Sequence, residues 1–147
     1  MKRFIACLAA FLFILNSSFA QSSFKDDAKT VFETIKSNMF KNGYQYQITF
    51  ENASDASMFV KEKTDYMVFF VYDNSGYPAP DFKLYLMNPD NEMKKKYSAR
   101  PDDVGQVGVA RVARAKFATK KFTGDKDKYP IKIESKPNAN IYIFYRG

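Results

Sequence analysis

The residues of this chain that could do chemistry are mainly carboxylates. Histidine is absent from the sequence, and its single cysteine, Cys7, lies in an N-terminal apolar segment that we expect to be removed. The common nucleophile and base pairs and most zinc or transition-metal sites are thereby excluded. Four carboxylates lie near the ends of neighbouring predicted strands: Asp73, Asp81, Asp90 and Glu92. Glycoside hydrolysis would need two carboxylates at a defined separation, but loop carboxylates on a small domain are more often solvated turn formers, so we expect no enzyme.

The same region offers ligands for one metal ion. Calcium takes oxygen ligands, and four side chains here carry them: Asp73, Asn74, Asp90 and Glu92. Asp73-Asn-Ser-Gly76 is similar to the first half of a calcium loop, but the closing glutamate is missing at the required spacing. The sequence therefore favours a chain without a cofactor, with calcium as the alternative.

Tyrosine supplies the other candidate site. The chain has ten tyrosines and no tryptophan. We expect four of the rings to face outward, those of Tyr77, Tyr85, Tyr97 and Tyr142, and Lys83 to share a face with Tyr85. Exposed rings can stack on sugars or anchor a protein partner. The alternative is that tyrosine is used only as a good strand residue with a polar end.

The N-terminal residues have the pattern of an export signal. Lys2 and Arg3 precede the apolar run 4–15, and Ser18-Phe-Ala20 has the small-x-small pattern of a cleavage site. A membrane anchor is the alternative, but the run has 12 residues and a spanning helix needs roughly 20. We expect residues 1–20 to be a signal peptide and 21–147 to form one exported domain, periplasmic or secreted, without a transmembrane segment.

The charge of the chain bounds its partners. Removing Lys2 and Arg3 with the signal lowers the formal net charge from +7 to +5. Such an excess is typical of a solvated surface, or it attracts anionic partners such as lipid head groups, polysaccharide or an acidic protein. Nucleic acid is disfavoured, because the sequence contains no recognisable motif for reading it.

The stretch from Asp65 to Met87 predicts the element that positions these residues. Read with a period of two, 66–72 is apolar on both faces, so this strand must lie inside the structure. The segment 82–86 alternates more cleanly, as in a strand with one face in water. Between them, 73–80 contains one glycine and two prolines, which favour a turn. We interpret the pair as the hairpin of a β-sandwich.

Residues 23–42 have a helical pattern instead. One stripe carries the apolar residues Phe24, Ala28, Val31, Phe32, Ile35 and Met39. Ser23 can cap the start of this helix, and Gly43 can end it. We expect the helix to cover the second apolar face of 66–72, packed either on the outside of the sandwich or across one end of it. A membrane-surface role is disfavoured, because the polar face mixes charges of both signs.

Short strands are expected on both sides of the central pair. They comprise 44–50, 56–61, 92–98, 129–134 and 141–145, with turns at 52–55, 88–91, 100–103 and 136–140. The segment 105–118 fits either a bulged strand or a short basic helix, and Gly105 and Gly108 favour the strand. About eight short strands separated by turn residues argue for two packed antiparallel sheets.

Three segments carry a resemblance to a known family. They are 64–69, the Asp-Phe-Lys-Leu-Tyr-Leu of 81–86, and Thr123-Gly124 followed by 129–133. Together, 58–145 resembles the bacterial pre-peptidase C-terminal domain, a jelly-roll-like β-sandwich attached to exported proteins. The third segment departs from the family pattern, because 125–128 separates the glycine from the tyrosine. The resemblance leaves the helix unexplained and implies an accessory module without shared catalytic residues.

These observations predict a mainly β protein, a jelly-roll-like antiparallel β-sandwich of about eight strands with one N-terminal amphipathic helix. The predicted function is that of a non-catalytic exported binding module for a cell-envelope protein or a glycan. The alternative is a structural or assembly component of the envelope, with a carboxylate-based hydrolase as a more distant one.

Overall fold

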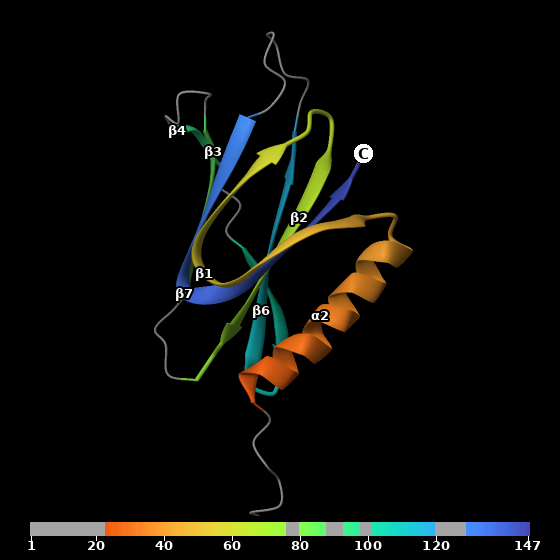
Figure 1. Ribbon diagram of the computed structural model, residues 1–147, viewed down its shortest axis with the longest axis vertical. Helices are drawn as coiled ribbons and strands as arrows, with labels where there is room; N and C mark the ends of the chain where they lie inside the picture. Colours follow the sequence, from red (N-terminus) through yellow and green to blue (C-terminus); the bar gives the residue numbers. More distant parts are fainter. Residues whose placement is uncertain (1–22, 76–79, 88–92, 98–100, 120–128) are drawn as a thin grey trace, which may run out of the picture.

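Most of the residues that the structure describes form antiparallel β-strands, and the helix among them packs against these strands (Figure 1). The computed structural model describes residues 23–75, 80–87, 93–97, 101–119 and 129–147; at 86–87, 93–97 and 129 it describes the backbone alone. In chain order, the described elements are α2 (Phe24–Lys41), β1 (Gln45–Val60), β2 (Asp65–Asp73), β3 (Asp81–Met87), β4 (Met93–Tyr97), β5 (Asp102–Val107), β6 (Ala110–Ala118) and β7 (Tyr129–Arg146).

The sheet is organised by its longest strand, β7. One edge of β7 pairs with β1 from Tyr129 to Tyr145, while its other edge pairs first with β3 and then with β2. The described strands belong to one antiparallel sheet of seven, in which β4, β3, β7, β2, β6 and β5 follow one another and β1 pairs with β7. The predicted antiparallel β class and the N-terminal helix are therefore confirmed.

Two of the predicted turns are not turns. The segments 52–55 and 136–140 were expected to divide β1 and β7 into four short strands, but both strands run through them without a break. Each of these two continuous strands replaces two short strands that the sequence had predicted. Figure 1 shows β1 and β7 curving together in the region of these residues.

The two misread segments lie opposite each other and form one shared bend. Ala53 pairs with Ala139, and the register shifts on either side of Ala53. Asn52 has a φ of 46°, and its N–H donates a 2.9 Å hydrogen bond to Oδ1 of Asn140. The Asn138 side-chain amide donates to the Asn52 carbonyl at 3.3 Å. Bulges of this kind bend a strand and sharpen its twist, so the turn-forming residues bend the sheet instead of ending its strands.

The stretch left open between strand and helix is extended. It contains β6 and the second half of β5, which pair with each other and are joined by Gly108 and Val109. The strand interpretation is thus confirmed, although the chain reverses within the stretch. The turn expected at 100–103 is wrong for Asp102 and Asp103, which lie in β5; Arg100 lies outside the described residues.

The central strand β2 is buried on both faces, as its sequence predicts. One face contributes Tyr66, Val68, Phe70 and Tyr72 to a core cluster shared with β1, β3, β6 and β7. The opposite face contributes Met67, Phe69 and Val71 to a second cluster, which contains the helix residues Ala28, Val31 and Ile35. The helix therefore covers the second face of β2, as expected.

The helix begins and ends at the predicted residues. The Asp26 N–H donates to Oγ of Ser23 at 3.3 Å, and Gly43, with a φ of 78°, follows the last turn. No helix in the described part of the chain is both long enough and apolar enough to span a membrane. The predicted signal peptide at 1–20 lies outside the described residues.

A buried carboxylate fixes the first turn of the helix to the β5–β6 connection. Asp27 is 6% exposed, and its Oδ2 accepts a 3.0 Å hydrogen bond from the Val109 N–H. Gly108 has a φ of +55°, and a Cβ atom on it would overlap this carboxylate, lying 2.6 Å from Cγ of Asp27. The residue must therefore be glycine for two separate reasons, its backbone conformation and this contact.

Candidate binding groove

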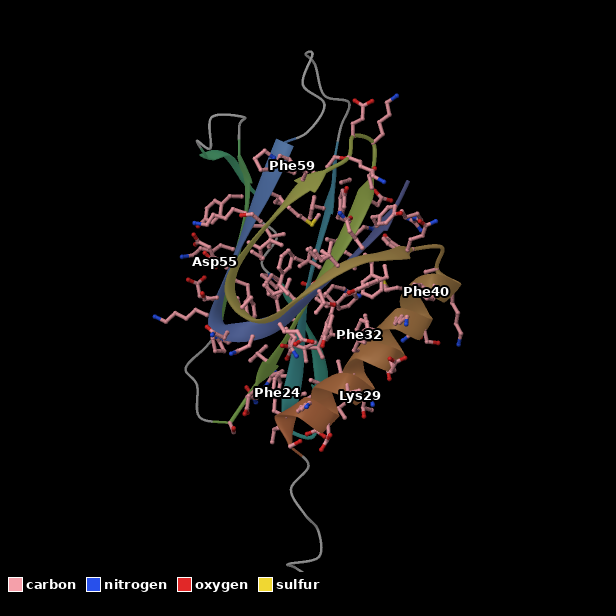
Figure 2. All side chains as sticks on the ribbon, viewed as in Figure 1. Phe24, Lys29, Phe32, Phe40, Asp55 and Phe59 are labelled. Atoms are coloured by element: carbon pink, nitrogen blue, oxygen red, sulfur yellow. The ribbon has the colours of Figure 1, made fainter. Side chains whose placement is uncertain are left out.

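A groove of about 760 Å³ runs between α2 and the strands β1 and β7. We call it the helix groove. Its helix wall carries Phe24, Lys25, Ala28, Lys29, Phe32 and Lys36, with Asp26 at the same end, and its sheet wall carries Tyr46, Thr49, Glu51, Asn52, Asn140 and Tyr142. Figure 2 shows Phe24, Lys29 and Phe32 along the helix.

Aromatic rings from three elements meet in this groove. Phe32 of α2 stacks on Tyr142 of β7 with 4.5 Å between ring centroids. Tyr46 of β1 packs edge-on against Phe32 at 5.9 Å and against Phe144 at 5.7 Å. Tyr142 is buried, but Tyr46 remains 39% exposed. The rings thus form a packed cluster that presents part of its surface to solvent.

The sheet wall adds polar groups beside the rings. The Tyr46 hydroxyl and Thr49 Oγ1 are hydrogen-bonded at 2.8 Å. Burial raises the pKa of the Tyr142 hydroxyl above its usual value, while a hydrogen bond with Asn140 lowers it and the charge of Glu51 raises it. Tyr142 is therefore neutral at physiological pH, and the groove offers hydroxyl, amide and carboxylate groups next to its rings.

The helix wall is cationic. Lys25, Lys29, Phe32 and Lys36 recur at intervals of four, three and four residues, which aligns them along one side of the helix. Lys36 Nζ lies 5.8 Å from the centroid of the Phe32 ring and 5.9 Å from that of Phe40. Within the described residues, no carboxylate lies within 4 Å of these three ammonium groups, whereas five other cations are paired in this way.

The tyrosines predicted as a binding patch do not lie together where they are described. Tyr142 was expected to face outward, and this is wrong: it is 6% exposed, because the helix covers its strand. Tyr85 and Lys83 lie on β3, outside the helix groove, and Lys83 pairs with Asp81 at 2.9 Å. Tyr77 and the side chain of Tyr97 lie outside the described residues. Ligand binding by these residues stays a prediction.

Two of the four predicted calcium ligands are described, and both have local partners. Asp73 Oδ1 accepts a hydrogen bond from the Ser75 N–H at 2.8 Å, and its bonds with the hydroxyl and N–H of Ser75 lower the pKa of this carboxyl. The Asn74 side chain donates to Gln106 at 3.4 Å. Asp90 and Glu92 lie outside the described residues, and the described ones contain no group of three acidic residues arranged to hold a metal ion.

Sequence reasoning had assigned the groove residues other roles. Phe32 was expected in the apolar stripe of the helix, and Tyr46 in the strand predicted at 44–50. The lysine spacing along 25–36 was a readable signal, because it places three cations and one ring on a single side of the helix. The spacing does not predict that this side of the helix lies next to β1, because that position depends on tertiary packing.

Comparison with known proteins adds no relative. No protein-family model matches the sequence, and a search of curated proteins finds no match. The resemblance to the pre-peptidase C-terminal domain therefore stays a prediction.

Proposed function

We propose that this chain is a non-catalytic exported domain that binds a glycan in the helix groove. The observation that carries the proposal is the ring cluster of Phe32, Tyr46 and Tyr142, partly open to solvent and bordered by polar side chains. Sugars present apolar C–H faces together with many hydroxyl groups. Such a ligand is matched by aromatic surface next to hydroxyl, amide and carboxylate groups.

The proposed architecture is a jelly-roll-like β-sandwich, as in the family that 58–145 resembles. Support comes from the contact between Phe70 of β2 and Phe82 of β3, whose ring centroids are 4.3 Å apart. These two strands are not neighbours in the sheet. A sandwich folded at the bend in β7 would bring these two rings together over one interior. In this arrangement, the helix groove lies on an outer face.

Affinity electrophoresis of residues 21–147 tests the glycan proposal. Gels containing xylan, laminarin, hyaluronate or polygalacturonate would be compared with gels without polysaccharide. We expect at least one polymer to retard the protein, and Tyr46→Thr to weaken that binding about tenfold, since the loss of a well-placed ring contact costs roughly 1–2 kcal/mol. Threonine preserves the β-propensity of the strand.

The matched control for this experiment is Phe59→Thr. Phe59 is also an aromatic residue of β1 and is 61% exposed, but it does not line the groove, and Figure 2 shows it far from the helix. The control should bind like the parent protein. Equal losses in the two variants, or the absence of retardation by all four polymers, would refute glycan binding in the helix groove.

An envelope assembly component is the second candidate, and a separate surface favours it. Val104 and Val107 are 49% and 44% exposed on β5, a strand at the edge of the sheet. They line a hollow of about 540 Å³ together with Ile35 and Met39 of the helix. The register shift at Val104 marks a bulge in this edge strand. Because bulges oppose pairing with another strand, a partner at this surface would contact the apolar side chains instead of extending the sheet. This candidate would be favoured if none of the four gel polymers retards the protein and the protein elutes in a complex of fixed composition.

A further inference from the structure

Lys25 and Lys29 each meet an unfavourable charge interaction in the helix, although Asp26 and Glu33 lie at spacings that attract Lys29. Lys25 lies in the first turn, where the positive end of the helix dipole disfavours a cation. Lys29 is four residues further on, and like charges at this spacing repel each other. Neither ammonium group has a carboxylate within 4 Å among the described residues. An anion bound between them would offset both penalties.

The acidic side chains of the groove leave this wall open to an anion. Asp26 Oδ2 accepts a 2.8 Å hydrogen bond from the hydroxyl of Ser23 at the helix start. Glu51 belongs to β1, on the sheet wall. The helix wall therefore carries three ammonium groups against the single carboxylate of Asp26, and the sheet wall carries the carboxylate of Glu51. This polarity would direct an acidic group of a ligand toward Lys25 and Lys29 and its hydroxyl groups toward Glu51.

We propose that the helix groove takes an anionic glycan, with the acidic group of one sugar held by Lys25 and Lys29. This inference rests on the proposed function and narrows it to one ligand class. The rings of Phe32 and Tyr46 line the same groove and supply the surface for the sugar ring. A carboxylate and a sulfate share the required chemistry, because both accept charge-assisted hydrogen bonds from ammonium groups.

The test compares ligands that differ in charge alone. Binding of residues 21–147 would be measured by isothermal titration calorimetry with polygalacturonate and with its methyl ester, and then with dextran sulfate and with dextran. The first pair tests the carboxylate, and the second tests the sulfate. We expect one charged polymer to bind and its neutral counterpart to bind at least tenfold more weakly. That binding should also weaken with added salt.

Matched variants separate the groove from the general charge of the protein. The double change Lys25→Gln and Lys29→Gln should weaken binding of the charged polymer roughly fivefold to tenfold, as the loss of two exposed ion pairs implies. The control is Lys41→Gln with Lys116→Gln, which removes the same charge at exposed positions away from the groove. This control should change the affinity less than twofold.

The outcomes distinguish the two proposals. If the methyl ester or dextran binds as tightly as its charged form and Tyr46→Thr abolishes that binding, the groove is a neutral glycan site and the anionic inference is wrong. If the control pair loses as much affinity as the groove pair, the attraction is non-specific and the inference is also wrong. If no polymer binds in the calorimetry, and none of the four gel polymers retards the protein, both proposals fail.

Discussion

Replacement of Gly108 by alanine should destabilise the protein by about 3–4 kcal/mol. An L-residue with a side chain pays roughly 1–2 kcal/mol at the left-handed φ that this glycine adopts. The new Cβ would also overlap the Asp27 carboxylate and displace it from the Val109 N–H. Loss of a hydrogen bond to a charged group adds about 1.5–3 kcal/mol. The total is a large fraction of the roughly 5–15 kcal/mol that stabilises a typical domain.

The assay is urea unfolding of residues 21–147 followed by circular dichroism, in a double-mutant cycle with Asp27→Ala. In the parent background, Gly108→Ala carries both penalties. In the Asp27→Ala background, the overlap and the hydrogen bond are already gone, so the same change should cost only about 1–2 kcal/mol. The coupling between the two positions should therefore be about 2 kcal/mol.

One control and one result decide this reasoning. Gly105 also has a positive φ, but no atom lies within 4 Å of the position its Cβ would occupy. Gly105→Ala should therefore cost only its backbone strain and show no coupling to Asp27→Ala. Equal costs of Gly108→Ala in the two backgrounds would show that the carboxylate does not constrain this turn.

Two further predictions concern titration and processing. Burial raises the pKa of the Tyr142 hydroxyl in the folded protein; this contribution to stability is fully present below the unfolded pKa of about 10 and is lost as pH rises through the folded value. Tyr142→Phe should therefore lose less of its free energy of unfolding between pH 8 and 11 than the parent protein, as urea titrations at each pH would show, and an equal loss would contradict this. When the full chain is expressed with its N-terminal segment in a bacterium with an export pathway, intact mass spectrometry of the exported protein should find Gln21 as the first residue; a mass that includes 1–20 would rule out cleavage there.

The central strand could be predicted because its evidence is local. A run that is apolar at every position from 66 to 72 fits a strand covered on both sides, and the stripe of residues 24–39 fits a helix in need of a partner. Each pattern indicates an apolar face that must be covered by another element. Packing these two faces against each other was sufficient to place the helix on β2.

The shared bend could not be predicted from the same kind of pattern. Asparagine at 52 and 140 tolerates a positive φ and offers a side chain that bonds to backbone, and these properties serve a turn and a bend equally well. The distinction lies in a hydrogen bond between Asn52 and Asn140, which are 88 residues apart in the sequence. The spacing of residues near Asn52 or near Asn140 cannot predict a hydrogen bond between them.

The candidate site was partly readable for a similar reason. Aromatic and lysine side chains were expected to bind a glycan or a protein, and the helix groove contains both types. Tyr142 was expected to face outward, but the helix covers the face on which it lies. The role of Asp27 could not be predicted, because its carboxylate bonds to the backbone of Val109, 82 positions further along the chain.

The arrangement of β7 sets the order in which this protein can mature. The strand that pairs with β1, β2 and β3 is translated after all three of them. Until residues 129–146 leave the ribosome, those strands lack their common neighbour, and contacts so distant in sequence form slowly. The sheet of a nascent chain of this design can therefore be completed only after residues 129–146 have been added, long after β1 has been made.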